Sequence, residues 1–263
     1  VASAAAAEET AEVREEHLPD GGRYVGELLH GQWHGQGSYS ASDGSVYEGQ
    51  WFKGFRTGHG RLRYDDGAVY DGQWRCDQAH GHGQHFAADG SSYEGQWVDN
   101  MKHGDGLELS RDGAKFRGQF KIGSKSGRGR TDWPNGSCYK GEFEEDAIHG
   151  DGVCSWSDGR RYEGQWVRGV INGEGVYSWS DGRSYHGQYS AGLRHGRGSL
   201  RWPDGRRFDG CWQGGLQHGP GELVGPAGER RRGKWQHGEL KTWSGPWMGP
   251  DGAAVSDVQL FSL

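Results

Sequence analysis

The sequence predicts an all-β fold, a single-layer antiparallel sheet built from stacked β-hairpins. Three observations support this. An aromatic ring recurs every 23 residues from Tyr24 to Phe208. Each ring is followed by glycine two residues later and by a large side chain four residues later. The chain of 263 residues contains 51 glycines but only 7 prolines, which excludes collagen and a proline-rich linker. Rings and glycines must therefore replace the usual aliphatic core.

The N-terminal segment precedes the first repeat. Residues 3–17 are good helix formers and Pro19 follows them, so we expect a short capping helix on the first hairpin. A disordered tail is the alternative for residues 1–19. The chain begins with Val1, which fits either a trimmed chain or a removed leader, and an organelle-processed protein is one interpretation of this start.

Each repeat contains two segments with the period of a β-strand. In the first, Tyr47, Gly49 and Trp51 alternate with polar residues, which places rings and glycines on one face. The second segment, such as 150–156, keeps the same parity. Residue types that tolerate positive φ lie between the two segments, and Asp-Gly or a variant closes each unit, as hairpin turns require. The mid-unit turn residues are Gly31, Gly54, Asp77, Asn100, Gly123 and Gly169.

A strand register can also be predicted. We expect Trp166 to face Gly175, and Gly164 to face Tyr177, because each ring then lies against a glycine. In the same register Tyr162 faces Trp179. A slip of two residues would place Gly164 opposite Gly175 and leave gaps, so the first register is preferred.

The repeat unit resembles a known family. The run from Tyr47 to Gly54, then Gly58-His59-Gly60 and Asp66-Gly67, is similar to MORN repeats, and the likeness covers about residues 20–238. The resemblance implies an elongated, twisted antiparallel sheet and a cytoskeletal, ciliary or junctional setting. Three regions follow: residues 1–19, a MORN-repeat array over 20–238, and a degenerate C-terminal capping segment with an apolar tail over 239–263. We expect 258–263 to cover the last strand, and partner binding is the alternative.

No pattern of catalytic residues is found, so we expect a non-enzymatic protein without catalytic residues, metal or cofactor. The Gly-x-Gly pairs lack the third glycine and the helix of a dinucleotide site. Six histidines share one repeat position, but two strands separate successive copies by about 9–10 Å, too far for one zinc ion. They are His34, His80, His103, His149, His195 and His218.

Two sets of residues are candidates for binding. The first is an aromatic face that is either the core, a surface for a partner segment, or both. It comprises Trp51, Trp74, Trp97, Trp133, Trp156, Trp166, Trp179, Trp202 and Trp212. The second is a basic set whose arginine pairs follow the Asp-Gly turns, so we expect them to form a stripe along one edge of the sheet. This stripe contacts anionic lipid or is a solvated edge neutralised by Asp158, Asp181, Asp204 and Asp209. The basic set comprises Lys121, Lys125, Arg128, Arg130, Arg160, Arg161, Arg206, Arg207, Arg230, Arg231 and Arg232.

Composition limits the partners. Thirty basic against 36 acidic residues argues against nucleic acid, and no apolar run reaches the roughly 20 residues of a transmembrane segment. The leading hypothesis is a structural scaffold or protein–protein interaction subunit of a larger cytoskeletal, ciliary or other assembly. The alternative is a peripheral membrane module that binds phosphoinositides or other anionic phospholipids. Self-pairing of the sheet into a homodimer is compatible with the first hypothesis. We expect a cytoplasmic, cytoskeletal or ciliary location.

Overall fold

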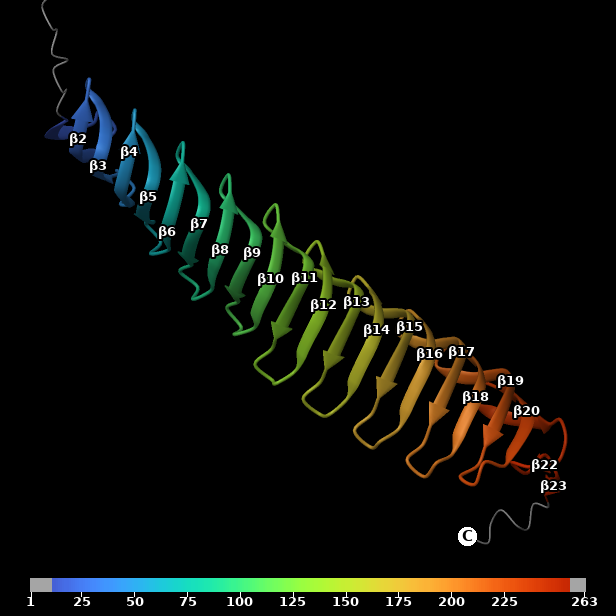
Figure 1. Ribbon diagram of the computed structural model, residues 1–263. Helices are drawn as coiled ribbons and strands as arrows, with labels where there is room; N and C mark the ends of the chain where they lie inside the picture. Colours follow the sequence, from blue (N-terminus) through green and yellow to red (C-terminus); the bar gives the residue numbers. More distant parts are fainter. Residues whose placement is uncertain (1–10, 256–263) are drawn as a thin grey trace, which may run out of the picture. The chain divides into compact units, whose positions relative to one another are not determined.

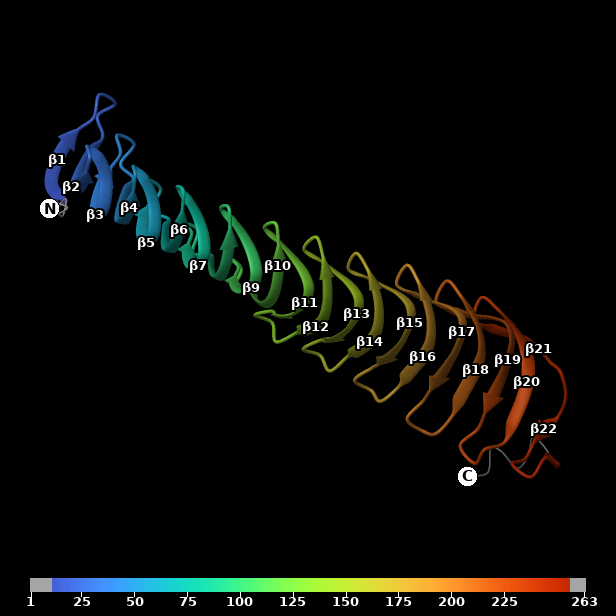
Figure 2. The same ribbon diagram turned by 45° about the horizontal axis from the view of Figure 1, so that its top comes forward.

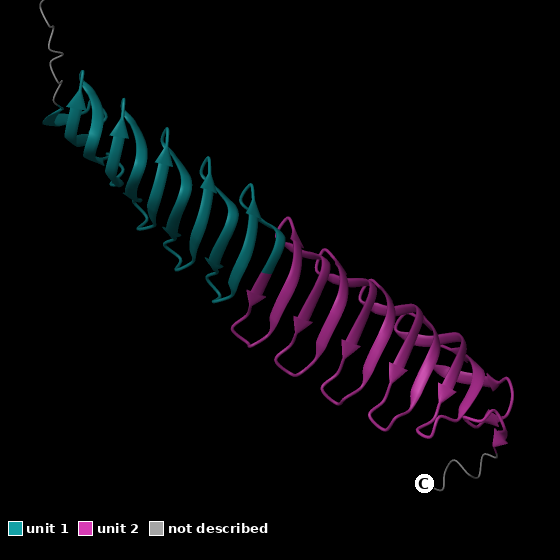
Figure 3. Cartoon of the chain, viewed as in Figure 1, with its two compact units in different colours: residues 1–129 teal, residues 130–263 magenta. Residues whose placement is uncertain are grey.

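The computed structural model describes residues 11–255, and these form 23 β-strands and no helix (Figure 1). The chain divides into two compact units at residues 129 and 130, called unit 1 and unit 2 (Figure 3). In each unit, consecutive strands pair antiparallel in one layer, and Figure 2 shows that the strands are curved. The exception is near the C-terminal end, where the strand Trp247–Met248 pairs with Arg230–Gln236. The predicted all-β stack of hairpins is confirmed.

The strands of unit 1 come first in the chain, and β11 crosses the division. They are β1 (Glu12–His17), β2 (Arg23–Leu29), β3 (Gln32–Ser40), β4 (Val46–Phe52), β5 (Phe55–Arg63), β6 (Val69–Arg75), β7 (Gln78–Phe86), β8 (Ser92–Val98), β9 (Met101–Leu109), β10 (Lys115–Lys121) and β11 (Ser124–Asp132).

The strands of unit 2 repeat the same lengths until the C-terminal end. They are β12 (Cys138–Glu144), β13 (Ala147–Ser155), β14 (Arg161–Val167), β15 (Val170–Ser178), β16 (Ser184–Ser190), β17 (Leu193–Arg201), β18 (Arg207–Gln213), β19 (Leu216–Val224), β20 (Arg230–Gln236), β21 (Glu239–Trp243), β22 (Trp247–Met248) and β23 (Ala254–Val255).

The turn inside each hairpin has the predicted backbone conformation. Two successive residues have positive φ, for example 51° at Lys53 and 85° at Gly54. This is the pattern of a type I′ turn, whose twist matches that of the flanking strands. All six turn residues that the sequence singled out have positive φ. The values are 71° at Gly31, 85° at Gly54, 65° at Asp77, 66° at Asn100, 84° at Gly123 and 79° at Gly169.

The predicted register within the hairpin is wrong by two residues. Between β14 and β15, Tyr162 pairs with Tyr177 and Gly164 pairs with Gly175. The glycine pair leaves no gap because the Tyr162 ring lies across it: a Cβ atom on Gly175 would lie 2.4 Å from the Tyr162 hydroxyl. That hydroxyl donates to the carbonyl oxygen of Gln165 at 3.1 Å. The gap expected from side-chain volume alone is thus filled by the tyrosine of the same strand.

A β-bulge follows the glycine pair and explains the first glycine of each Gly-x-Gly. The register shifts between Gly164 and Trp166, and Gly173 on the facing strand has a φ of 67°. The Gln165 side-chain oxygen accepts the backbone N–H of Glu174 at 2.9 Å. A backbone donor released by the bulge is thereby satisfied.

Tryptophan joins each hairpin to the one before it. Trp166 pairs with Gly150 across β13 and β14, and its indole nitrogen donates to the carbonyl oxygen of Gly152 at 3.3 Å. The expected tryptophan–glycine pairing therefore exists, but between hairpins. The same indole-to-carbonyl bond recurs at Trp51, Trp74, Trp97 and Trp212.

The N-terminal helix prediction is wrong over Glu12–His17, which forms β1 and pairs with β2. Helix propensity is a weak prior, and the exposed edge of β2 supplies a row of backbone partners that outweighs it. Glu15 also accepts from Arg23 at 2.8 Å, and Glu16 accepts from the Trp33 indole at 2.9 Å. The rest of the expected helix, residues 3–10, and the apolar tail 258–263 lie outside the described residues.

Candidate interaction surface

The two faces of the sheet differ in chemistry. The "ring face" is the face that carries the repeated tyrosines and tryptophans, and the "polar face" is the opposite one. On the ring face Tyr47 contacts Trp51 and Trp74 edge to face, with ring centroids 5.0 and 5.3 Å apart. Tyr47 is 1% exposed. Residues 11–255 form no second layer over this face, so the interlocked rings are themselves the core.

The nine tryptophans expected on one binding face fall into two groups. The first group is core, with exposed fractions between 4% and 8%. It comprises Trp51, Trp74, Trp97, Trp166 and Trp212. The second group is only half-buried, follows the end of the second strand of a hairpin, and is called the "indole row". It comprises Trp133, Trp156, Trp179 and Trp202, all in unit 2.

Two members of the indole row contact the same neighbouring ring. The Tyr177 ring lies between two of its members, 5.6 Å from Trp156 and 4.6 Å from Trp179. An arginine lies over each of the last three indoles, at 5.3 Å for Arg160, 5.4 Å for Arg183 and 5.5 Å for Arg206. These cation–π contacts hold the rings while leaving part of each ring in solvent.

Each of these arginines is also held by the aspartate of its turn. Arg160 donates to the Asp158 carboxylate at 2.7 Å, and the same pair recurs in the next two repeats. The backbone N–H of Arg160, then its guanidinium, keep the pKa of Asp158 below its usual value. The row arginines are therefore orientated and charge-balanced.

Arg194 differs from them. Its guanidinium lies 4.3 Å from the Trp212 ring and 5.9 Å from the Trp179 ring, and it donates to the carbonyl oxygen of Gly215 at 2.8 Å. Burial lowers the pKa of Arg194. Within residues 11–255, Arg194 forms no ion pair. The ring face of unit 2 thus carries an unbalanced positive charge beside its rings.

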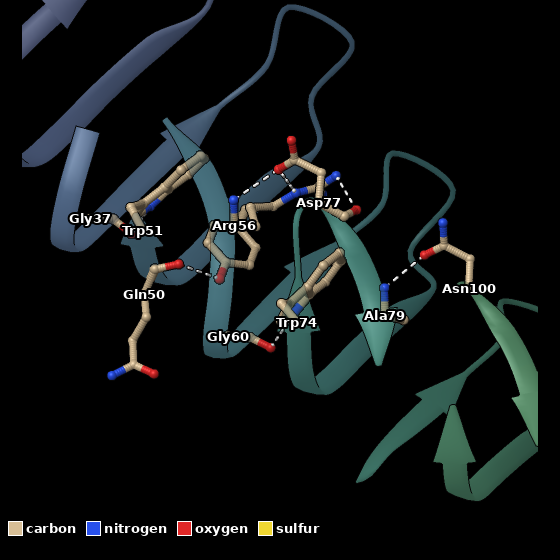
Figure 4. A network of polar contacts seen from close by, with 10 residues as sticks. Gly37, Gln50, Trp51, Arg56, Gly60, Trp74, Asp77, Ala79 and Asn100 are labelled. Atoms are coloured by element: carbon tan, nitrogen blue, oxygen red, sulfur yellow. Dashed lines mark hydrogen bonds and ion pairs between the residues drawn. The ribbon is translucent and has the colours of Figure 1, made fainter. Parts of the chain in front are cut away.

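The ring face of unit 1 carries charged side chains instead. A hollow of about 900 Å³ is lined by rings together with Arg56, His85, Lys102 and Glu108. Arg56 lies 4.5 Å from the Trp74 ring and binds Asp77 through both its backbone and its side chain, at 2.9 and 3.1 Å (Figure 4).

Two lysines share one carboxylate in this hollow. Glu108 accepts from Lys102 at 2.5 Å and from Lys125 at 2.7 Å. Burial would raise the pKa of Glu108, but the hydrogen bonds and charges of the two lysines outweigh burial and lower it. Burial, followed by the charge of Lys102, lowers the pKa of His85. The hollow is therefore a polar, ion-paired surface.

The basic set does not form one stripe. Arg160 stacks on the ring face, whereas Arg161, the next residue, pairs with Glu163 at 2.8 Å. Successive residues point to opposite sides of a strand, so Arg161 lies on the polar face. Several of the basic residues form ion pairs within the described part of the chain. They are Lys125 with Glu108, Arg130 with Asp132, Arg160 with Asp158, Arg161 with Glu163, Arg206 with Asp204, Arg207 with Asp209 and Arg232 with Glu222.

The other four basic residues are Lys121, Arg128, Arg230 and Arg231. Lys121 lies at the end of β10 and Arg128 lies on β11, and both are exposed. Arg231 stacks on Trp243 at 4.6 Å and donates to the carbonyl oxygen of Gly245 at 2.8 Å. The basic residues are thus distributed over both faces and both units.

Two of the six repeated histidines lie beside carboxylates. His149 is 3.3 Å from Glu144, and His80 is 3.6 Å from Asp99. Among the residues described, no three His, Cys, Asp or Glu side chains gather as metal ligands would. None of these residues forms a helix long and apolar enough to span a membrane.

Among solved structures, the chain is similar to a TCP domain of SAS-4 from Drosophila melanogaster in complex with a proline-rich motif of Ana2. They share 13% identity, with 72% of this chain and 96% of that one covered, and a TM-score of 0.38. The TCP10 domain of Danio rerio CPAP, in complex with a peptide of STIL, shares 14% identity over 89% and 99%, with a TM-score of 0.28. Likenesses this low do not indicate a function. No curated protein matches the sequence.

The family model for the MORN repeat matches nine consecutive segments. They are residues 24–46, 47–69, 70–92, 93–115, 116–138, 139–160, 162–182, 185–206 and 208–230. Each begins at the buried ring that opens a hairpin, so the sequence repeat and the structural repeat coincide. The chain therefore belongs to the MORN-repeat family.

Proposed function

We propose that this protein is a non-enzymatic interaction module, a subunit or scaffold of a larger assembly, that binds another protein on the ring face of unit 2. The observation that carries the proposal is the indole row. Its four indoles recur at one repeat position and are only half-buried, although the tryptophans of the core are buried. The cytoskeletal or ciliary setting implied by the family resemblance belongs to the same proposal.

Energetics support this choice of surface. Tryptophan and arginine dominate the binding energy of protein interfaces because they bury large rigid areas. Here both are already orientated: Arg183 stacks on Trp179 and is held by Asp181 at 2.7 Å. A partner would therefore lose little side-chain entropy on binding, which favours association.

The distribution of charge favours a protein partner over a lipid surface. Anionic membranes bind clusters of basic residues that face one way. In this chain Arg160 and Arg161 face opposite ways, and each is paired with a carboxylate. An enzymatic role has no support on the ring face, because the MORN repeat is a non-enzymatic module and its copies present like groups rather than a convergent set of unlike ones.

Site-specific photocrosslinking tests the proposal. A photoreactive phenylalanine analogue at position 202 replaces an indole-row residue, and one at position 176 replaces Val176, an exposed residue of the polar face in the same unit. The full chain is expressed in native cells and its crosslinked complexes are identified by mass spectrometry. We expect a specific protein adduct at position 202 and none at position 176.

Two results would contradict the proposal. One is the same adduct at equal yield from both positions, which would show that the ring face is not selected. The other is a purified chain that gives no adduct at position 202 but floats with anionic liposomes at low salt and not at high salt. That second result would support the lipid alternative instead.

A further inference from the structure

We propose that the indole row binds a polyproline II segment that carries a proline at every third residue and an acidic residue between two of them. This inference rests on the proposed function and names the class of partner. It depends on three features of unit 2: the spacing of the indoles, their half-exposed rings, and the charge of Arg194.

The spacing comes first. Equivalent residues of successive repeats are separated by two strands, and strands lie about 4.8 Å apart, so the indoles recur at about 9.6 Å. The Tyr177 ring contacts both Trp156 and Trp179, at 5.6 and 4.6 Å, which sets an upper limit on the distance between the two indoles and is compatible with that spacing. A polyproline II helix advances about 3.1 Å per residue with three residues per turn. Every third side chain therefore returns to the same side after about 9.3 Å.

Other backbone conformations match less well. Two turns of an α-helix advance about 10.8 Å, so its side chains would drift by more than about 1 Å at every indole. Three residues of a β-strand span about 10 Å, but the third side chain then points away from the surface because strand side chains alternate. Of these three backbone forms, polyproline II best presents the same side chain to successive indoles.

The chemistry of the row suits proline. Aromatic surfaces bind proline-rich segments because the polyproline II helix is already formed and its rings pack flat on aromatic rings. Trp156 and Trp202 each lie under one arginine, and Trp179 lies under two, Arg183 and Arg194. All three indoles are only half-buried within the described part of the chain. The backbone of such a segment has no internal hydrogen bonds, so its carbonyl groups are free to accept from neighbouring donors.

Charge complementarity specifies the acidic residue. The arginines over the row are balanced by Asp158, Asp181 and Asp204. Arg194 forms no ion pair within the described part of the chain and lies beside Trp179 and Trp212. A carboxylate in the spacer next to the proline on Trp179 would compensate that charge at a half-buried site, where an ion pair is screened least.

Unit 1 provides an internal comparison, because its repeats have other residues at the position of the row. These are Ala41, Tyr64, Ala87 and Ser110. The proposal therefore assigns the segment to unit 2 alone.

Fluorescence anisotropy with synthetic peptides tests the inference on the full chain. The probe is a labelled peptide of four Pro-x-x units with one glutamate in a spacer. The control peptide has the same composition with proline at every fourth residue. We expect the first peptide to bind at least about ten times more tightly. Trp156→Ala and Trp179→Ala should each weaken it about tenfold, because truncated interface anchors typically cost that much.

Matched variants make the result decisive. Val176→Ala, on the polar face of the same unit, should leave affinity unchanged, and Trp156→Phe should lose less than Trp156→Ala. Circular dichroism and thermal unfolding confirm that each variant is folded. Arg194→Gln should weaken the glutamate peptide several-fold and should not weaken a peptide in which glutamine replaces the glutamate.

Equal binding of the two peptides, or unchanged binding by both tryptophan variants, would overturn the inference. These results can be told apart from a failure of the proposed function itself. If photocrosslinking places a protein partner on the ring face while the proline peptide does not bind, only the polyproline II assignment falls.

Discussion

Units 1 and 2 share one backbone plan but carry different chemistry on the ring face. In both, a tyrosine ring lies across a glycine pair: Tyr70 over Gly83 in unit 1, and Tyr162 over Gly175 in unit 2. The side chains nine, fifteen and seventeen positions after that tyrosine differ. Unit 1 places an ion pair there, Lys102 with Glu108. Unit 2 places tryptophan at the seventeenth position of three repeats. Its other two positions carry tyrosine, aliphatic side chains and Arg194, which forms no ion pair within residues 11–255.

This contrast shows that the fold and the chemistry of the ring face are encoded at separate positions of the repeat. The ring, the two paired glycines and the bulge glycine pack against backbone and against each other, so they specify the sheet. The positions nine, fifteen and seventeen residues after the tyrosine vary, and their side chains set the charge of the ring face. Four changes should test this separation, from the largest expected effect on stability to the smallest.

Raising the pH should unfold both units together. Burial raises the pKa of Tyr47 and of Tyr162 to about 12, with neighbouring charges as smaller causes. The tyrosine pKa is therefore higher in the folded state than in the unfolded chain, where it is near 10. The protonated tyrosines contribute their full stability below pH about 10, and this contribution is lost as pH rises through about 12. We expect cooperative loss of β-structure in this window, measured by far-UV circular dichroism and tyrosinate absorbance. Hydrogen exchange that shows one unit opening well before the other would contradict the shared plan.

Adding one methyl group at the paired glycine should be equally harmful in both units. Gly83→Ala and Gly175→Ala each place a Cβ atom 2.4 Å from a tyrosine hydroxyl. We expect each to lower the free energy of unfolding by about 2–4 kcal/mol, because overpacking displaces a buried ring. Gly245→Ala is the control, since nothing lies within 4 Å of its Cβ position. Urea denaturation measures all three, and a loss in only one unit would count against a common plan.

Removing the shared carboxylate should affect unit 1 alone. Glu108→Gln leaves Lys102 and Lys125 without this partner, and we expect a loss of about 1–2 kcal/mol at pH 7. Because the folded pKa of Glu108 is lowered, its contribution is present above the unfolded value of about 4.5 and disappears as pH falls through the folded value. Wild type and variant should therefore converge in acid. Tyr177→Phe, at the same repeat position in unit 2, should show no such pH dependence.

Relieving backbone strain at one turn should give the smallest effect, a gain. Ile122 has a φ of 51° and is 64% exposed, and a β-branched residue is strained in that conformation. Ile122→Asn should raise the free energy of unfolding by about 0.5–1 kcal/mol. Arg168→Asn, at the equivalent turn of unit 2, should gain less because Arg168 is not β-branched. A thermal unfolding series that ranks Arg168→Asn above Ile122→Asn would contradict this account.

Local features of the chain could be predicted from the amino-acid sequence. The 23-residue period identified the repeat, and residue types such as Gly54 and Asp77 identified the turns, because tolerance of positive φ is a property of the residue itself. The alternation of Tyr47, Gly49 and Trp51 likewise identified the ring face, since strand geometry has a period of two.

Contacts between segments could not be predicted in the same way. The register depended on where the Tyr162 ring lies and on a bulge opposite Gly173, and neither is a property of one strand. Residues 12–17 have helix propensity, yet they pair with β2. The backbone hydrogen bonds available at an open sheet edge stabilise a strand more than helix propensity stabilises a helix.

The candidate site shows the same division. Trp166 is buried and Trp156 is only half-buried, although both are tryptophan. The residue type alone therefore could not distinguish a core tryptophan from a surface tryptophan. The tertiary structure decides between them. The rings of Tyr139 and Tyr162 pack edge to face against Trp166, at 5.7 and 5.1 Å, and enclose it, whereas Trp156 follows the end of its strand and keeps part of its ring in solvent.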